Sequence, residues 1–533
     1  MVLYLRQGKS ITRRHVFMTL LICLIIAISH LAAIWLRLGW GTSEAEAYDW
    51  TAGLLWLQNN WIALAGSMVV YALVFYAGGM YEPPMRRRRS AGIDFLPLAT
   101  VFISASLVGL VFYAGSGEQA MMGRGIWGIA SGLTLVLSYV MRGIHVHLID
   151  KGHFRRRALV LADSDQGAEA VRQVMRHATV PLYHILGVVR CDVGAPTADP
   201  EAGPSATAPD PLDADAPWPV LGGLDTLEGL VDDRDVAAVL VELSPNYPAN
   251  ILNRLRHLRY SGVAILDHVG LSEQLVHEIP LSHINEQWLM ASALNSSVVQ
   301  IHHIKRAVDV LLSLIALIPG LPLMAIGALL VKLTSKGPAF YKQVRVGLGG
   351  KLFTLCKLRT MRTDAEAAGA VWAAGNDSRV TKVGHYLRKW RLDEIPQILN
   401  ILRGDMSWVG PRPERPEFTK KLAEVIPFYD ERHLVQPGLT GWAQVCYPYG
   451  ASVEAAARKL QYDLYYIKNM TILLDFSILL RTCRTILVGL AHEDDEDAAD
   501  AMTLAEIVGD QPVRRDPIAN ETESNAQDGK GKE

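Results

Sequence analysis

The chain has 533 residues, of which 50% are hydrophobic and 20% are charged, and its formal net charge is −2. This length exceeds a single hydrophobic core and predicts about three or four units. The near-neutral charge argues against a nucleic-acid-binding protein. The five cysteines form no CxxC pair, which argues against a zinc site or a disulfide framework.

Four apolar segments in the first third of the chain approach the roughly 20 residues that a membrane helix needs. They are residues 16–36, 61–78, 95–114 and 126–141. The first could instead be a secretion signal, but no small-residue cleavage pattern follows it and further apolar segments do. We therefore expect residues 1–150 to form a bundle of four transmembrane helices.

The distribution of Lys and Arg predicts the orientation of these helices. Basic residues precede the first segment, lie between the second and third at Arg86 to Arg89, and follow the fourth. The other two loops carry acidic residues and little basic charge. Because basic loops remain in the cytoplasm, the chain after Arg155 is expected to begin there.

Residues 151–300 are predicted to form a Rossmann-like α/β domain, because short apolar runs alternate with helical stretches. A Pro, Ala and Asp-rich insertion at 195–217 reads as a flexible loop. The sequence after the first run, 162–167, lacks the GxGxxG pattern of dinucleotide sites. A regulatory or oligomerising scaffold is the preferred interpretation. The predicted strands and helix lie at 158–161, 185–189, 236–241, 249–260 and 263–266.

A fifth apolar segment, 310–331, contains no charge and is long enough to cross a membrane. Both of its flanks are basic, so a crossing would place one of them on the wrong side. Pro319 and Pro322 lie in its middle, where proline kinks or breaks a helix. We predict a re-entrant helix-break-helix; an ordinary kinked transmembrane helix is the alternative.

The candidate active site is Asp393-Glu394, which follows a basic run from Arg388 to Arg391. Cations neutralise phosphate oxygens and carboxylates bind Mg²⁺, so this combination suits a phosphorylated substrate. An aspartate ionised at neutral pH can attack phosphorus without a separate base. On local sequence alone, the simpler interpretation is that Asp393 is the N-cap of a helix, and it is favoured over a catalytic role.

Five motifs occur in the order found in the bacterial sugar transferases called polyprenyl-phosphate hexose-1-phosphate transferases, and the chain resembles this family over residues 300–490. One departure is Ile318, where some members have serine before the helix-breaking proline. The motifs are the broken helix, KLRTM at 357–361, LDEIPQ at 392–397, GPRP at 410–413 and PGLTGW at 437–442.

The resemblance implies a monotopic, α-rich catalytic domain at 301–490 that uses Mg²⁺. Asp393 would be the nucleophile, and Glu394 a metal ligand or electrostatic partner, with Asp405 a weaker metal candidate. Basic motif residues would hold phosphates. These are Lys357, Arg359, Arg388 and Arg412.

In the family's two-step scheme the aspartate attacks the sugar-bearing phosphorus of a UDP-sugar, the nucleoside monophosphate leaves, and undecaprenyl phosphate takes the sugar phosphate. The resemblance thus implies the initiating step of exopolysaccharide or O-antigen synthesis at the bacterial inner membrane. Glucose is the first expectation for the sugar, with galactose and acetamido sugars open. A homodimer and a CoA-binding-like character of the Rossmann-like domain are further expectations from the resemblance.

The helical stretch 469–490 is either an interfacial helix that contacts membrane lipids or a core helix. The polar tail at 491–533 reads as disordered. Two other functions are alternatives to sugar-phosphate transfer. A nucleotide-sugar dehydratase or epimerase is disfavoured by the missing glycine-rich motif, and an inactive membrane scaffold by the intact Asp-Glu pair.

Overall fold

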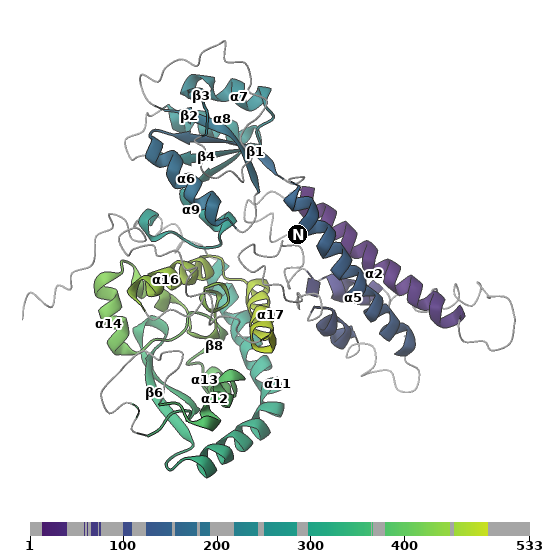
Figure 1. Cartoon of the computed structure of the whole chain (residues 1–533), viewed down its shortest axis with the longest axis vertical. Helices are drawn as coiled ribbons and strands as arrows, with labels where there is room; N and C mark the ends of the chain where they lie inside the picture. The colour runs from purple at the N-terminus through teal and green to yellow at the C-terminus, as the bar shows by residue number, and fades with distance from the viewer. Residues whose placement is uncertain are drawn as a thin grey trace, which may run out of the picture. The chain divides into compact units, whose positions relative to one another are not determined.

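The computed structural model combines helices with a parallel α/β sheet and divides into two units, Met1–Val276 and His277–Glu533 (Figure 1). Each unit is described by itself. The structure describes residues 13–39, 58, 61, 65–72, 74–75, 100–108, 124–151, 155–178, 182–191, 218–243, 250–284, 297–363, 365, 379–447 and 452–488.

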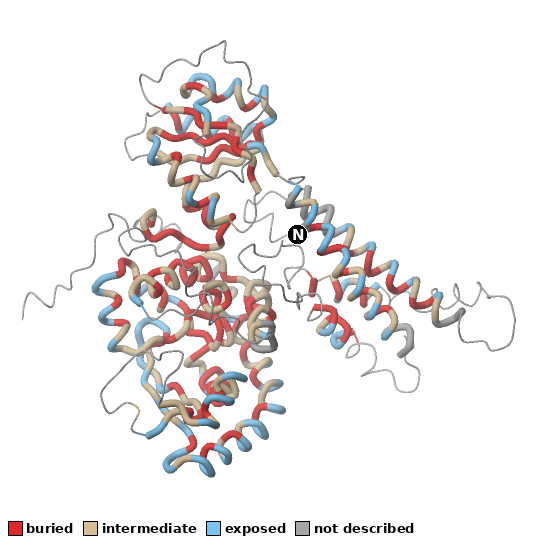
Figure 2. Tube along the Cα trace, in the orientation of Figure 1, coloured by how far each residue is buried: buried red, intermediate tan, exposed pale blue. Residues whose placement is uncertain are grey.

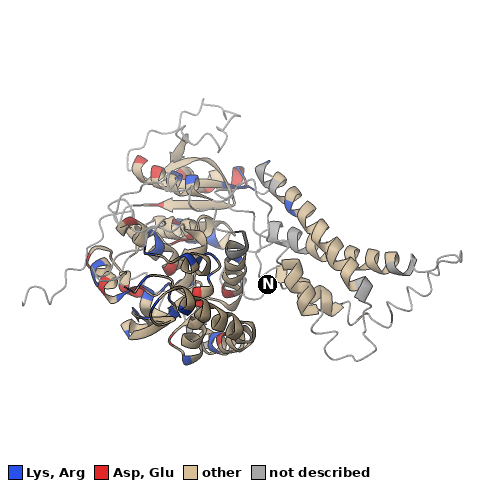
Figure 3. Ribbon diagram, turned by 60° about the horizontal axis from the view of Figure 1, so that its bottom comes forward, with Lys and Arg blue, Asp and Glu red and all other residues tan. Residues whose placement is uncertain are grey.

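The first unit begins with two long apolar helices, α2 (Arg13–Gly39) and α5 (Arg124–Asp150). Of the second and third predicted membrane segments, only residues 61, 65–72, 74–75 and 100–108 are described, and they are helical. Side chains from all four segments meet in one hydrophobic cluster that includes Ile26, Tyr71, Val101 and Met141. Figure 3 shows how few charged residues α2 and α5 carry.

Polar side chains link these helices to one another. The hydroxyl of Ser67 lies 3.2 Å from Nε2 of His30, and the hydroxyl of Tyr71 lies 2.9 Å from that of Ser131. The outer side of α2 is apolar at helical spacing, at Leu20, Leu24, Ile28, Leu31 and Trp35. Among the described helices, Trp127–His145 and Ile301–Thr334 are long and apolar enough to cross a membrane. Internal polar contacts with an apolar exterior are typical of membrane helices.

The predicted parallel sheet is present in the first unit, with strand order β3-β2-β1-β4-β5. Its central strand β1 is buried from Ala158 to Ala162, since helices cover both faces. This is the strand order of a Rossmann-like fold. The insertion at 195–217 lies outside the described residues. The elements are β1 (Arg156–Ala162), α6 (Asp165–His177), β2 (Tyr183–Arg190), β3 (Val220–Gly223), α7 (Leu227–Asp233), β4 (Ala238–Glu242), α8 (Ile251–Tyr260), β5 (Ala264–Asp267) and α9 (His268–Leu275).

The second unit is built on one long helix, α11 (Ser297–Thr334), followed by the hairpin β6 (Phe340–Val346) and β7 (Leu352–Leu358). Residues 277–284 also belong to it, because Trp442 Nε1 donates to His277 O and Ile279 N donates to Gln461 O. The remaining elements are α12 (Lys382–Lys389), η5 (Leu392–Gln397), α13 (Ile398–Arg403), β8 (Ser407–Val409), α14 (Pro416–Val425), η6 (Tyr429–Leu434), β9 (Gly438–Thr440), α15 (Trp442–Cys446), α16 (Val453–Lys468) and α17 (Ile472–Val488).

Helix α11 runs through Pro319 and Pro322 as one continuous helix whose axis bends (Figure 1). The predicted break is thus a bend, since proline removes one hydrogen bond and crowds the preceding turn. Much of the surface of α11 is exposed (Figure 2). The exposed side chains include many large apolar ones, up to 77% exposure at Ile318. After the bend, Val331 packs with Leu358 of β7 and Leu387 of α12.

Before the bend, polar side chains fasten α11 to the rest of the unit. Lys305 Nζ donates to Asp475 Oδ2 of α17 at 2.6 Å, and Tyr466 donates to the other oxygen of Asp475 at 2.8 Å. Trp408 donates through its backbone N–H to Asp309 and through its indole to Ser313. Since α17 contributes Asp475 and buried Ile478 to this packing, it is at least partly a core helix.

We expect Asp475→Asn to lower the free energy of unfolding by about 3–5 kcal/mol, because it leaves the buried Lys305 ammonium without its anion. A thermal or denaturant unfolding series on the detergent-solubilised chain measures this. The control is Glu417→Gln, which removes a pair with Arg415 in which the glutamate is 59% exposed. That change should cost less than about 1 kcal/mol. Equal losses in the two variants would contradict a stabilising role for the Lys305–Asp475 pair.

Candidate active site

The Asp-Glu pair lies in the short 3-10 helix η5, directly after a tight turn at the end of α12. Arg391 forms this turn with φ 54°, in the left-handed region that non-glycine residues seldom adopt. Neither Arg391, which caps η5, nor Gln397, which caps α13, makes a side-chain cap bond. Asp393 is only 7% exposed, and its Oδ1 has no hydrogen-bond partner among the described residues. Asp393 therefore does not serve as a helix cap.

The bend in α11 lies against η5. A Cβ atom built on Gly320 would lie 3.4 Å from Cγ2 of Ile395 and 3.6 Å from Cδ1 of Ile398. These are ordinary van der Waals distances, so the two isoleucines touch the helix at its bend. Leu392 of η5 packs against the cluster around Leu358, which also contains Val331 of α11. The proline bend and the Asp-Glu pair, more than 70 residues apart in the sequence, therefore form one structural feature.

The two carboxyl groups of the pair have opposite environments. Glu394 receives a hydrogen bond of 2.9 Å from Arg412 and lies 3.4 Å from Arg391. Burial alone would raise the pKa of Glu394, but these two guanidinium groups bring it below its ordinary value. Burial raises the pKa of Asp393 to about 6, and the negative charge of Glu394 adds to the rise. Glu394 is thus held ionised, while Asp393, whose Oδ1 has no hydrogen-bond partner among the described residues, has a pKa raised to about 6.

Two of the predicted phosphate-binding residues face Asp393. Both Lys357 and Arg388 act on it electrostatically and lower its pKa, against the effect of burial. Arg388 is held in place because its Nε donates to the hydroxyl of Thr360 at 2.9 Å. Lys357 stands opposite Tyr341 in the hairpin, with its Nζ 5.4 Å from the centre of that ring. Burial lowers the pKa of Lys357 to about 8, which nearby Arg345 reinforces and Asp393 opposes.

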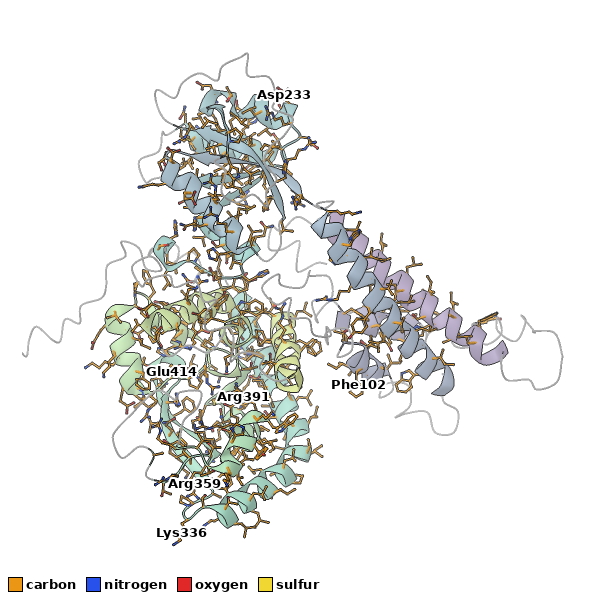
Figure 4. The ribbon with its side chains drawn as sticks, viewed as in Figure 1. Phe102, Asp233, Lys336, Arg359, Arg391 and Glu414 are labelled. Carbon is orange, nitrogen blue, oxygen red and sulfur yellow. The ribbon has the colours of Figure 1, made fainter. Side chains whose placement is uncertain are left out.

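Two other predicted residues lie elsewhere in the unit. Arg359 donates to the backbone and hydroxyl oxygens of Ser335 at 2.9 and 2.7 Å, at the end of α11. Figure 4 accordingly shows Arg359 beside Lys336. Asp405 accepts a hydrogen bond of 3.1 Å from Asn400, beyond the far end of α13 from Asp393. Neither residue is among the groups that shift the pKa of Asp393.

The GPRP and PGLTGW motifs form two loops that pack backbone against backbone. A Cβ on Gly410 would come within 2.3 Å of Gln436 O, and one on Gly438 within 2.1 Å of Gly410 N. Only glycine permits such an approach. Gly410 N donates to Thr440 O at 2.9 Å, which continues the short β8–β9 sheet. The glycines of both motifs are therefore required by the packing that presents Arg412 to Glu394.

Three arginines of this site were not among the predicted site residues. Arg391 contacts Glu394, Arg345 lies near Lys357, and Arg432 donates to the backbone oxygen of Arg412 at 3.0 Å. The basic runs that contain Arg391 and Arg345 were visible in the sequence. Arg432 lies outside every motif, so its role depends on the tertiary structure.

The carboxyl groups present suit a divalent cation that also binds substrate phosphates. Mg²⁺ takes oxygen ligands and commonly uses only one or two protein carboxylates, completing its coordination with phosphate and water. The ionised Glu394, next to Asp393, supplies such a carboxylate. The chemistry of the donor set therefore fits Mg²⁺.

Comparison with known proteins agrees with this geometry. A family model described as bacterial sugar transferase matches residues 300–489. The chain is 44% identical over 219 residues to a UDP-N-acetylgalactosamine-undecaprenyl-phosphate N-acetylgalactosaminephosphotransferase of Aeromonas hydrophila, covering 41% of this chain and 51% of that relative. It thus spans only about half of that protein.

Two further relatives are covered more fully. A putative undecaprenyl-phosphate N-acetylgalactosaminyl 1-phosphate transferase of Bacillus subtilis (strain 168) is 47% identical over 161 residues, 30% of this chain and 83% of the relative. A UDP-glucose:undecaprenyl-phosphate glucose-1-phosphate transferase of Xanthomonas campestris pv. campestris is 32% identical over 384 residues, 70% of this chain and 75% of the relative. The last match extends well beyond the catalytic unit. The chain therefore belongs to the bacterial sugar transferase family and is a transferase of that class.

Proposed function

We propose that the chain transfers a sugar 1-phosphate from a UDP-sugar to undecaprenyl phosphate, with Asp393 as the nucleophile. The observation that carries the proposal is the environment of Asp393. Its buried Oδ1 has no hydrogen-bond partner in the described part of the chain, and Lys357, Arg388 and Arg391 lie close enough to act on its charge. A free carboxylate oxygen among cations is suited to attack a phosphorus that carries negative oxygens.

In the first proposed step, a carboxylate oxygen of Asp393 forms a bond to the sugar-bearing phosphorus. The bond from this phosphorus to the bridging oxygen breaks, and UMP leaves with that oxygen. In the second step, a phosphate oxygen of undecaprenyl phosphate attacks the same phosphorus and releases the Asp393 carboxylate. The product is an undecaprenyl diphosphate sugar, and no external oxidant, reductant or water is consumed.

The basic residues have separate tasks in this scheme. Lys357 and Arg388 neutralise the phosphate oxygens while charge develops on them, which is the main electrostatic demand of phosphoryl transfer. Arg412 keeps Glu394 ionised. Glu394 would hold Mg²⁺, which would supply positive charge to stabilise the negative charge of the diphosphate.

Membrane attachment follows from the same arrangement. We propose that α11 enters the cytoplasmic leaflet and returns at its bend, and that the four apolar segments of the first unit cross the inner membrane. The exposed apolar surface of α11 supports this, as do the basic residues on both of its flanks. Because the bend touches Ile395, η5 would lie beside the membrane-inserted helix, close to the lipid acceptor.

The direct test of function is to incubate the purified full-length chain with undecaprenyl phosphate, Mg²⁺ and single UDP-sugars, and to measure UMP release. UDP-glucose is tested first, beside UDP-N-acetylgalactosamine, because relatives named for each sugar are similar to this chain. Release of UMP with formation of a lipid-linked sugar is the expected result. If no sugar gives UMP, the proposal fails, and a chain that only recruits other enzymes becomes the better reading.

The pH dependence of kcat/KM is expected to be bell-shaped. Asp393 attacks only when ionised, so activity should fall as the pH drops through about 6, its raised pKa. Lys357 contributes its charge only when protonated, so activity should also fall as the pH rises through about 8. Lys357→Arg should remove the basic limb alone, because arginine stays protonated. An unchanged basic limb in that variant would assign it to another group.

Single cysteines placed after Val331, in a background without the native cysteines, test the topology of α11. We expect an impermeant thiol reagent to label Lys336→Cys only when the cytoplasmic side is accessible, because the helix returns to that face. A cysteine in the first part of α11, before the apolar segment 310–331, such as His302→Cys, provides the matched position. Labelling of the two from opposite sides would show that α11 crosses the membrane. Mass measurement of the solubilised chain tests the proposed homodimer.

A further inference from the structure

The second unit contains a buried ion pair that touches neither the proposed substrate nor the Asp-Glu pair. Arg432 of η6 and Asp463 of α16 lie 2.9 Å apart, with their side chains 7% and 2% exposed. Arg432 also donates to the hydroxyl of Tyr429 at 2.6 Å. Replacing a buried ion pair by apolar residues is often neutral or stabilising. Fold stability alone therefore does not explain why the charges are there.

A third contact of Arg432, with the backbone of Arg412, indicates what the buried ion pair does. The Nη2 nitrogen of Arg432, which donates to Asp463, also donates to the backbone oxygen of Arg412 at 3.0 Å. Arg412 lies between Pro411 and Pro413, neither of which has a backbone N–H to fix the loop. The position of this loop consequently depends on what donates to its carbonyl groups.

All three consecutive carbonyl groups of the loop accept a hydrogen bond, each from a different part of the unit. Gly438 N donates to Pro411 O at 2.9 Å, Arg432 to Arg412 O at 3.0 Å, and Arg345 to Pro413 O at 2.9 Å. The middle bond holds the residue whose guanidinium contacts Glu394 at 2.9 Å. A path of direct contacts thus runs from Asp463 through Arg432 and Arg412 to Glu394.

We propose that Arg432 and Asp463 are positioning residues, which hold Arg412 where its guanidinium contacts Glu394, beside Asp393. The fork of the arginine is necessary for this task, because one guanidinium binds the carboxylate, the Tyr429 hydroxyl and the loop carbonyl together. Lysine keeps the charge but cannot make the three contacts in that geometry. The inference rests on the proposed function, since the positioned groups are those of the proposed transfer.

The experiment uses the full-length chain in detergent, with UMP release from the best UDP-sugar as the rate. Arg432→Lys is expected to lower turnover by about 100-fold, the effect of a small misplacement of a reacting group. The loss should lie in kcat, with the KM for the UDP-sugar close to that of the unmodified chain, because Arg432 acts on the position of Arg412 and Glu394. Asp463→Asn is expected to lower kcat in the same way.

The matched control is Arg458→Lys. Arg458 also forms a buried ion pair, with Glu278 at 3.0 Å, and its side chain is 12% exposed. Among the described residues its side chain donates to Glu278 and Gln461, and not to the loop Pro411–Pro413. It should lose thermal stability to a similar extent but keep the kcat of the unmodified chain. Equal losses of kcat in Arg432→Lys and Arg458→Lys would overturn the proposal and leave the Arg432–Asp463 pair a purely structural role.

A double-mutant cycle gives an independent test. If Arg432 acts through Arg412, Arg432→Lys should lower the rate much less in an Arg412→Lys background than alone. Additive losses would overturn the proposal. Should Arg432→Lys fail to fold, Tyr429→Phe, which removes a single contact of the guanidinium, is measured in the same cycle. Absence of activity in the unmodified chain would refute the proposed function itself, which is a distinct outcome.

Discussion

Replacing Asp393 with asparagine is expected to lower UMP release by at least about 10⁴-fold, the scale seen when an enzyme nucleophile is removed. The amide has nearly the same shape but carries no negative charge, so it cannot form the acyl phosphate bond. Because Oδ1 of Asp393 makes no hydrogen bond to the described residues, the substitution breaks no internal contact at that atom. The fold should therefore survive, and thermal unfolding should be unchanged or slightly raised.

The control for this variant is Asp430→Asn, at a carboxylate of η6 that is 55% exposed. Its rate should stay within a few-fold of that of the unmodified chain. Mass spectrometry of the acid-quenched enzyme, incubated with a UDP-sugar and no lipid acceptor, should reveal an adduct at Asp393 in the unmodified chain only. Substantial turnover in Asp393→Asn would remove this residue from the role of nucleophile.

Glu394→Gln is expected to lower turnover by about 10²–10³-fold, as the loss of a preorganised charge does in other active sites. Its pH profile should move as well. The negative charge of Glu394 helps to raise the pKa of Asp393, so the neutral amide should lower that pKa and shift the acid limb to lower pH.

The magnesium dependence of Glu394→Gln separates its two proposed roles. If Glu394 binds the metal, the variant should need more Mg²⁺ for half-maximal activity; an unchanged requirement would restrict it to an electrostatic role. Glu424→Gln, an isosteric change at an exposed carboxylate of α14, is the matched control. Retention of full activity by Glu394→Gln would show that the neighbouring charge is unnecessary.

The sequence by itself determined the class of this protein. The order of five short motifs predicted the family, and the α/β alternation after Arg155 predicted a parallel sheet, which the structure contains. These features are readable because each depends on local spacing: alternation and helical period within a segment, and glycine or proline at positions that only they suit. Pro319 and Pro322 likewise predicted an irregularity in the helix, and α11 bends in that region (Figure 1).

The tertiary structure decided how the charges are distributed. In the sequence, Asp393 and Glu394 are equivalent neighbours, and helix capping was the simpler reading of Asp393. In the fold, Arg412 pairs with Glu394, whereas the buried Oδ1 of Asp393 has no hydrogen-bond partner in the described part of the chain. Desolvation and pairing are long-range effects of packing, so no local pattern reports them.

Long-range packing also decides which of the predicted basic residues lie near Asp393 and which do not. Arg359 and Lys357 are two positions apart on one motif, yet Arg359 binds Ser335 at the end of α11, whereas Lys357 lies near Asp393. Arg432 and Asp463 carry no motif at all, and only the packing of η6 and α16 brings them to the loop that presents Arg412. The sequence therefore predicted the class of reaction, and the tertiary structure showed which of the charged side chains lie near Asp393 and Glu394.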